Sequence, residues 1–317
     1  MGRNLVTGGL GFIGHHLTQL LLSQGDEVST FDVAASSRLG PAPEGVRAFR
    51  GDLSNWAQVL EAVKESGADC IYHSGALLPP VSEQHPQAAY AVNVTGTFNV
   101  LEAARLLGVN QVIFLSTLAT FGRDVPKVVP NDIAQHPRSM YGTTKVCGER
   151  LGEYYHRRFG IDFRAVRLTP LLGMGRFDTA QSAYVYRAVQ DSALGRPYSI
   201  YVAPGTSISV TYVKDAAWGL LDLKNAPQDR LTRRLYNLFG FAVTAGDLAD
   251  AIRRAVPDAE LAFNPEPKMI ELVEDLPERL EDTPARRDWD WKIRYDLDGS
   301  VRDMVQDIRA HRHVYEQ

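Results

Sequence analysis

The sequence has few cysteines, no long apolar run and no long run of basic charge. Its 317 residues include two cysteines, Cys70 and Cys147, and neither belongs to a Cys-x-x-Cys pair. Isolated cysteines favour a reduced, cytoplasmic setting over a disulfide framework. Every apolar run is interrupted well before the length of a membrane-spanning helix, and no signal-peptide cleavage pattern follows Met1. We therefore expect a cytoplasmic protein without a membrane partner.

The charge balance narrows the classes of partner further. The chain has 34 basic and 38 acidic residues, a formal charge of −4. This balance argues against nucleic acid as the main partner. No His and Cys cluster has the spacing of metal ligands, so we predict no metal site. The length allows one large domain, or a domain with a satellite.

The first half of the chain alternates strand-like and helix-like segments. Strands joined by crossover helices predict a parallel sheet with helices on both faces, which is the doubly wound α/β architecture of Rossmann folds. The expected strands are Asn4–Thr7, Glu27–Val33, Val46–Arg50, Cys70–Ser74, Gln111–Ser116 and Phe163–Leu168. The expected helices are Phe12–Ser23, Trp56–Ser66, Ala88–Leu107 and Tyr141–Phe159.

The second half is less regular and predicts a smaller α/β substrate domain interleaved with the end of the sheet. We expect the Rossmann domain to span residues 1–169 plus about 205–242, and the substrate domain 170–204 plus 243–317. The expected strands are Tyr198–Val202, Ser207–Val213 and Leu235–Leu238. The expected helices are Ala180–Leu194, Asp215–Leu223 and Ala245–Val256, the last capped by Thr244. The expected loops are Gly173–Asp178, Asn264–Lys268 and the segment around Leu276–Arg279.

A glycine-rich loop follows the first strand. Gly8, Gly11 and Gly14 have three-residue spacing, which allows a tight turn, a close approach of the backbone to a pyrophosphate, and close helix–strand packing. The start of the next helix, with Phe12 and Ile13, offers N–H groups and a positive dipole end to phosphates. A glycine triplet alone also fits a flexible turn. The prediction of a pyrophosphate site therefore depends on the position of this triplet, directly after a strand and directly before a helix.

Asp32 ends the second strand, about 20 residues after the loop, where a carboxylate accepts hydrogen bonds from ribose hydroxyls. The carboxylate would repel a 2′-phosphate, which favours NAD over NADP. Arg38 could soften this preference, although an exposed, solvated arginine is the simpler interpretation.

Tyr141 and Lys145 are four residues apart and fall on one face if a helix begins at Tyr141. A nearby ammonium and a nicotinamide charge would lower the phenol pKa, so that Tyr141 could exchange the proton of a substrate hydroxyl. Ser116 and Thr117 end a strand at the carboxyl edge of the sheet, where a hydroxyl could polarise the substrate oxygen. The alternatives are a surface Tyr–Lys pair and hydroxyls that bind only local backbone.

Together these motifs resemble the extended short-chain dehydrogenase/reductase superfamily. The resemblance covers nearly the whole chain and includes Thr7–Gly14, Gly51–Leu53, His73–Ala76, Asn93–Thr97, Ser116–Gly122, Tyr141–Lys145 and Arg167–Pro170. It implies a catalytic set of Thr117, Tyr141 and Lys145, assisted by Ser116. It also implies that Asp52 and Leu53 meet the adenine, that Ser74, Gly75 and Ala76 line the pyrophosphate and ribose, that Asn93 supports the site, and that Leu168 and Pro170 lie by the nicotinamide.

Two branches of this superfamily compete. Sugar-nucleotide epimerases usually have Asn where this chain has Pro170, and a diphosphate-binding Arg near the position of Ile208. Short-chain L-threonine 3-dehydrogenases resemble the later chain, including Tyr236–Leu238 and Arg287–Lys292. Their pocket nevertheless has a Ser at the position of Pro79, and a Thr-Thr-Asp-Tyr segment that corresponds to residues 177–180. Both departures remove hydroxyl groups from the expected pocket.

The sequence therefore predicts an NAD-dependent dehydrogenase that oxidises the secondary alcohol of a small polar substrate, such as a 3-hydroxy amino acid or a related hydroxy acid. Leu78, Thr117, Tyr141, Arg176 and Asp178 are the candidate substrate contacts. An NAD-dependent sugar-nucleotide epimerase is the alternative, and a non-catalytic NAD sensor is a third hypothesis. The resemblance also implies a homodimer formed through helices 88–107 and 141–159.

Overall fold

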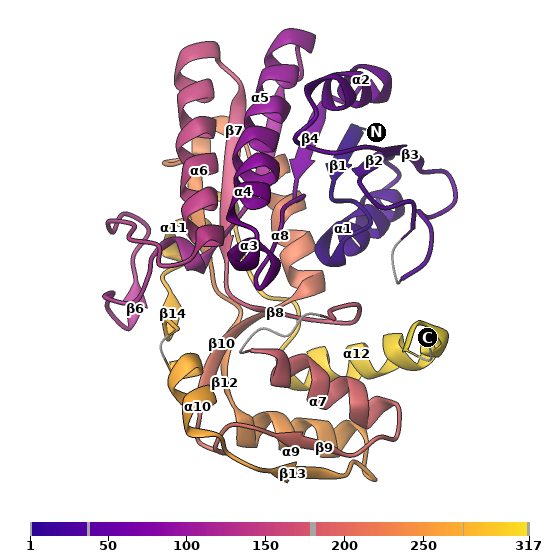
Figure 1. Cartoon of the computed structure of the whole chain (residues 1–317), viewed down its shortest axis with the longest axis vertical. Helices are drawn as coiled ribbons and strands as arrows, with labels where there is room; N and C mark the ends of the chain where they lie inside the picture. Colours follow the sequence, from indigo (N-terminus) through magenta and orange to yellow (C-terminus); the bar gives the residue numbers. More distant parts are fainter. Residues whose placement is uncertain (1, 37–38, 178–181, 275, 316–317) are drawn as a thin grey trace.

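The computed structural model describes residues 2–36, 39–177, 182–274 and 276–315, and it contains a seven-stranded parallel sheet (Figure 1). The strand order is β3-β2-β1-β4-β5-β7-β11. The order reverses between β1 and β4, and ligands of open α/β sheets bind outside the carboxyl ends of the strands at such a point. The strands are β1 (Arg3–Thr7), β2 (Glu27–Asp32), β3 (Arg47–Arg50), β4 (Cys70–His73), β5 (Gln111–Thr117), β7 (Asp162–Leu168) and β11 (Leu235–Leu238).

Helices cover both faces of this sheet, which confirms the predicted doubly wound fold. Helices α1 (Phe12–Ser23) and α8 (Val213–Asn225) pack together on one face. Helices α2 (Trp56–Ser66), α5 (Gly96–Leu107) and α6 (Met140–Phe159) pack together on the other. Each face has its own apolar core, and the α1/α8 core continues into the C-terminal part of the chain. We call the sheet with these five helices the larger lobe.

The expected long helix over residues 88–107 is made of three successive helical segments. Helix α4 (Pro86–Ala89) leads into a π-helical turn, Tyr90–Thr95, and then into α5. Single π turns widen a helix locally and are frequent at functional sites. This turn carries Asn93, one of the predicted site residues.

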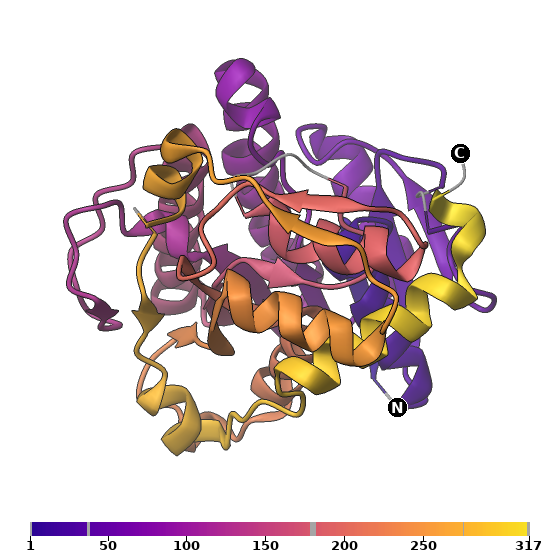
Figure 2. The ribbon, with the colours of Figure 1, turned by 90° about the horizontal axis from the view of Figure 1, so that it is seen from below.

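The smaller lobe lies beyond the carboxyl edge of the sheet and consists largely of C-terminal segments (Figures 1 and 2). Helix α12 packs against both α7 and α9. A three-stranded sheet has the order β12-β10-β8, and β13 pairs with β9. The lobe comprises β8 (Leu171–Leu172), α7 (Ala183–Ala193), β9 (Tyr198–Ile200), β10 (Ser207–Tyr212), β12 (Phe241–Thr244), α9 (Ala245–Ala255), β13 (Leu261–Phe263), α10 (Pro267–Glu274) and α12 (Leu297–Ala310).

Shorter elements join the two lobes. Strand β6 pairs with β14, and a 3₁₀ turn follows β5 directly. None of the helices formed by the described ranges is long and apolar enough to cross a membrane. The remaining elements are α3 (Val81–Gln84), β6 (Val128–Val129), β14 (Arg279–Leu280), α11 (Thr283–Trp289) and the 3₁₀ segments Leu118–Thr120, Gln228–Arg230 and Arg312–Tyr315.

The smaller lobe departs from the sequence prediction in several places. The expected loop over residues 264–268 is wrong at its end, because Pro267 opens α10, a position where its missing N–H costs nothing. Helix α12 and strands β6, β8, β12, β13 and β14 were not predicted. The Thr244 cap is confirmed, since its hydroxyl accepts from the Asp247 N–H at 3.0 Å. Strand β10 pairs with β8 and β12, whereas β11 belongs to the large sheet and α8 packs against it; the proposed domain boundaries stay a prediction.

Candidate active site

The glycine loop between β1 and α1 is held by contacts that leave no room for side chains. Gly8 has a φ of +68°, and a Cβ there would lie 2.7 Å from the Cα of Gly75. A Cβ on Gly14 would lie 2.0 Å from the Gly8 carbonyl oxygen. No side chain caps the first turn of α1, which begins after Gly11. The result is a backbone cradle at a helix N-terminus, and a pyrophosphate fits its shape and polarity.

Asp32 stands at the end of β2 beside this cradle. Its carboxylate accepts from the N–H groups of Leu10 and Ala34, each at 3.1 Å. The side chain is half-buried. The glycine loop and the loop after β2 are therefore both tied to this carboxylate, which holds it at the position where acids of such folds bind ribose hydroxyls. Arg38 lies outside the described residues.

The loops after β3 and β4 form the adjoining wall. A Cβ on Gly75 would lie 2.7 Å from Cδ1 of Leu53, so the two loops touch. Asp52 accepts from both the N–H and the hydroxyl of Ser54, at 2.8 and 2.9 Å. Ser74 donates its hydroxyl to the Thr7 carbonyl oxygen at 2.7 Å, and Ala76 is half-buried. The predicted adenine and ribose contacts thus share one side of the sheet edge with the glycine loop.

Asn93 links this edge to α6, the helix that carries Tyr141 and Lys145. Its side chain accepts from the Leu77 N–H at 2.7 Å and donates to the Leu77 carbonyl at 3.0 Å. The same amide donates to the hydroxyl of Thr144, which lies between Tyr141 and Lys145 on α6. The π-helical turn thereby fixes the segment before Leu78, and the Leu78 side chain itself is exposed.

Tyr141 and Lys145 lie on one face of α6, and the lysine nitrogen is 5.8 Å from the centre of the tyrosine ring. Lys145 is buried and donates to the Leu115 carbonyl at 2.8 Å. Burial lowers the pKa of Lys145 to about 7, against an opposing contribution from Glu149. Burial has the opposite effect on Tyr141 and raises its pKa, because the charged form of a phenol is the deprotonated one. The sequence predicted that the Lys145 ammonium and a nicotinamide would lower the Tyr141 pKa. In the chain without a nicotinamide the pKa is raised instead, because desolvation disfavours the phenolate and the Lys145 ammonium donates to a carbonyl and not to the phenol.

The two hydroxyls at the end of β5 point to different partners. Thr117 is half-buried, and its hydroxyl accepts from the Ala119 N–H at 3.2 Å. Ser116 is buried and donates to the Glu149 carboxylate at 2.6 Å. Thr117 therefore borders the open edge of the sheet, whereas the Ser116 hydroxyl belongs to a buried network behind it. Leu168 and Pro170, at the end of β7, complete this edge.

The remaining substrate candidates come from the loop after β8. Arg176 donates to the Leu171 carbonyl at 2.7 Å and lies over the Tyr186 ring, at 5.1 Å from its centre. These contacts hold Arg176 within the smaller lobe. Asp178 lies outside the described residues.

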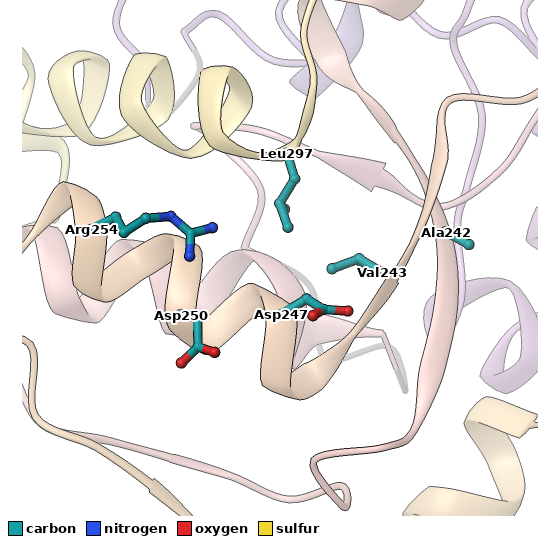
Figure 3. A pocket seen from close by; sticks show the side chains of 6 residues that line it. All are labelled: Ala242, Val243, Asp247, Asp250, Arg254 and Leu297. Atoms are coloured by element: carbon teal, nitrogen blue, oxygen red, sulfur yellow. The ribbon is translucent and has the colours of Figure 1, made fainter.

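Two cavities lie away from the Tyr141–Lys145 pair. One, of about 250 Å³, lies between β12, α9 and the start of α12 in the smaller lobe (Figure 3). The other, of about 430 Å³, lies behind α6 and includes Gln135, Arg150 and Arg167 in its lining. Among the described residues, no group of three or more His, Cys, Asp or Glu side chains could hold a metal ion.

Comparison with known proteins places these features in a family. The model of the NAD dependent epimerase/dehydratase family matches residues 4–238. The chain belongs to this family. The mitochondrial L-threonine 3-dehydrogenase of Sus scrofa is 31% identical over 98% of this chain and 84% of its own length. An uncharacterized epimerase/dehydratase of Staphylococcus haemolyticus is 30% identical over 97% of this chain and 98% of its own. The solved structure of L-threonine dehydrogenase from Clostridium difficile has a TM-score of 0.90 at 30% identity, with 99% of both chains covered.

This member of the epimerase/dehydratase family has site residues that sequence reasoning passed over. Glu83 of α3 accepts from the N–H groups of Met140 and Tyr141, at 2.9 and 3.1 Å, and so caps α6, the helix of the predicted Tyr141–Lys145 pair. His73 is buried between Thr7 and Thr97, at 2.7 and 2.9 Å, and burial lowers its pKa to about 3. The Thr97 hydroxyl donates to the Asn93 carbonyl, so it accepts from the imidazole. These contacts join segments that are distant in sequence. His73 and Thr97 lie inside motifs of the family resemblance, which could have marked them, whereas Glu83 lies outside every such motif.

Proposed function

We propose that this family member is an NAD-dependent dehydrogenase that oxidises the secondary alcohol of a small polar substrate, with a 3-hydroxy amino acid such as threonine as the leading candidate. The observation that carries the proposal is the Tyr141–Lys145 pair on α6, whose lysine donates to the Leu115 carbonyl of β5, two residues before Thr117. At the same carboxyl edge of the sheet, the loops after β1, β2 and β4 form a cradle that suits a dinucleotide. Similarity to L-threonine dehydrogenases over the full length of this chain supports the choice of substrate class.

The cofactor would be held mainly by backbone. The cradle of Gly8, Gly11 and Gly14 suits the pyrophosphate, and Asp32 suits the hydroxyls of the adenosine ribose. Asp52 and Leu53 would line the adenine side, and Gly75 would lie along the pyrophosphate and ribose. NAD, when bound, accepts the hydride that leaves the alcohol carbon.

The proton chemistry falls to three side chains. The Thr117 hydroxyl would orient the alcohol oxygen, and the Tyr141 phenolate would take its proton. Lys145 would bind the nicotinamide ribose and stabilise the phenolate. Burial alone raises the pKa of Tyr141, so the phenolate needs the positive charges that gather when the site is filled. Activity should therefore increase with pH.

A substrate screen that follows NADH absorbance tests the proposal. It should include threonine, phenylserine, serine, hydroxy acids and sugar acids. We expect NAD reduction with at least one 3-hydroxy amino acid or hydroxy acid. In Tyr141→Phe, kcat should fall by about 10²–10⁴-fold, while NAD affinity remains. Unchanged function in Tyr141→Phe would instead support a non-catalytic NAD sensor.

The epimerase alternative is tested in the same experiment with UDP-sugars. Its diphosphate would need a cation near residue 208, and Ile208 is a buried apolar side chain in β10. Sugar inversion without net NADH formation would overturn the dehydrogenase proposal.

We also propose a homodimer through the faces of the 88–107 helical segment and α6. Tyr90, Phe98, Leu106, Tyr154 and Phe159 are 40–56% exposed there, and exposed apolar side chains of neighbouring elements favour an interface. Light scattering after size-exclusion chromatography should give twice the chain mass of 35.1 kDa. A monomer at micromolar concentration would contradict this.

A further inference from the structure

A buried ion pair lies one helical turn beyond Lys145. Glu149 of α6 has a side chain that is 0% exposed, and Arg167 of β7 has one that is 4% exposed. The guanidinium of Arg167 donates twice to the Glu149 carboxylate, both times at 2.8 Å. Burial by itself would raise the pKa of Glu149, but hydrogen bonds and the charge of Arg167 lower it overall. The pair is therefore ionised in the folded chain.

The same carboxylate collects contacts from other elements around the site. Ser116, at the end of β5, donates to it at 2.6 Å, and Gln135 donates at 2.8 Å. Arg167 also donates to the Asn131 carbonyl at 2.9 Å and lies over the ring of Phe121, at 4.9 Å from its centre. One ion pair thus ties α6, β5, β7 and the loops after β5 together.

These hydrogen bonds connect residues next to the catalytic candidates, on β5 beside Thr117 and on α6 one turn after Lys145. Ser116 lies between Leu115, whose carbonyl accepts from Lys145, and Thr117. Ser116 is also the strand partner of Arg167 in the β5–β7 register. Glu149 follows Lys145 by one turn on the same helix. Any movement of the Glu149 side chain relative to β5 therefore changes how Thr117 lies relative to Lys145 and Tyr141.

We propose that the Glu149–Arg167 pair is a positioning element: through Ser116 and the α6 backbone, it fixes the end of β5 against α6 and sets the relative placement of Thr117, Tyr141 and Lys145. The inference rests on the proposed function for the roles of those three residues. Neither member of the pair touches the open edge of the sheet, so both act through other residues. The glycine cradle is held by other contacts, so the pair acts on the site through the placement and charge of Lys145 and the placement of Tyr141 and Thr117.

The pair also bears on the charge of Lys145. The charged and titratable groups around its ammonium are Tyr141 and Glu149 on α6, Arg167 on β7 and His73 on β4, which burial keeps neutral. The Phe114 ring lies on its other side, with its centre 4.7 Å from Nζ. Glu149 is the charge that raises the pKa of Lys145 against burial. Removing the pair should shift the Lys145 titration to lower pH.

Two variants test the proposal without leaving a buried charge unpaired. Ser116→Ala removes only the hydroxyl that ties β5 to Glu149. Glu149→Met with Arg167→Met removes the whole pair, and buried pairs replaced by apolar side chains of similar volume commonly keep the fold. Glu102→Gln is the matched control, because Glu102 binds Arg105 and Tyr155 between α5 and α6, apart from the site. The measurements are thermal unfolding, kcat and KM across pH, and NADH affinity by fluorescence across pH.

The double variant should remain folded and, well below the Lys145 midpoint, bind NADH as before, with kcat reduced by about 10- to 100-fold, the usual result of a small misplacement of catalytic groups. Ser116→Ala should lose a few-fold in kcat, and Glu102→Gln should lose nothing. The midpoint of NADH affinity against pH should move lower by about half a unit in the double variant. A folded double variant with unchanged kcat and pH midpoint would overturn the proposal. If no substrate is found, the proposed function fails, and the pH midpoint still decides this inference.

Discussion

The glycine loop of the larger lobe and the turn at Gly205 in the smaller lobe differ in how tightly their glycines are packed. In the larger lobe, a Cβ on Gly8 or Gly14 would lie within 2.7 Å of backbone atoms. In the smaller lobe, Gly205 has no atom within 4 Å of where a Cβ would stand. The walls of the expected dinucleotide site are therefore formed by backbone atoms, and a residue with a side chain at Gly8 or Gly14 would change its shape.

The substrate side of the site is made of side chains. Its candidates, Leu78 and Arg176, lie on loops, and Arg176 is held by other groups of the smaller lobe. Side chains on loops can change without disturbing the strands beneath them. From this comparison we expect the cofactor chemistry and the choice of substrate to depend on separate parts of the chain. Four predictions break or sharpen this contrast, in order of decreasing effect.

The largest effect is expected from Gly14→Ala. The new methyl group would lie 2.0 Å from the Gly8 carbonyl oxygen, so α1 must move away from the glycine loop. Overpacking of this kind costs about 1–3 kcal/mol, and a displaced cradle should weaken NADH binding by about 100-fold. Fluorescence titration and thermal unfolding measure both effects. Gly205→Ala is the control in the smaller lobe and should change neither. Equal NADH affinity in the two variants would contradict the idea that the tight packing of the glycine loop determines cofactor binding.

The same contrast explains what the sequence could predict. The strand, loop and α1 helix of the cradle follow from neighbouring residues, and α1 and α2 have the predicted bounds, Phe12–Ser23 and Trp56–Ser66. Local propensity and glycine spacing suffice there. Helix α12 escaped prediction because its burial is decided by α7 and α9, which are distant in sequence. The buried bonds of His73 also join separate segments, so no local pattern predicts them.

The second prediction concerns His16, which lies where the lobes meet. Its Nε2 donates to the Met174 carbonyl at 2.9 Å, and burial lowers its pKa from 6.5 to about 4. The folded state thus resists protonation that the unfolded chain accepts below pH 6.5. Stability from this neutral histidine is complete above pH 6.5 and is lost as the pH falls toward 4.

His16→Gln keeps an N–H for Met174 and removes the titration. Between pH 7 and pH 5, the free energy of unfolding should fall by about 2 kcal/mol more in the parent chain than in this variant. Urea unfolding at the two pH values measures the difference. Equal losses in both proteins would mean that His16 is protonated within the fold.

The third prediction concerns Asp32, the carboxylate from which the preference for NAD over NADP was predicted. Asp32→Ser removes the carboxylate that accepts from the ribose hydroxyls and repels a 2′-phosphate. NAD affinity should fall by about tenfold, near 1.4 kcal/mol, and NADP affinity should rise. Glu27→Gln, at the exposed start of the same strand, is the control for the change of charge. If NADP binding stays unmeasurable in Asp32→Ser, other groups exclude the phosphate.

The smallest effect is expected at the cavity of the smaller lobe shown in Figure 3. Arg254 lines it and pairs with Asp298 at 2.7 Å, with side chains that are 57% and 38% exposed. Exposed pairs contribute about 0–1 kcal/mol, so Arg254→Gln should change the free energy of unfolding by less than about 0.5 kcal/mol and leave kcat and NADH affinity unchanged. Thermal unfolding and the substrate assay check this. A loss of turnover in this variant would make the cavity part of the substrate site, and the smaller lobe would then act on the reaction through more than the loop that carries Arg176.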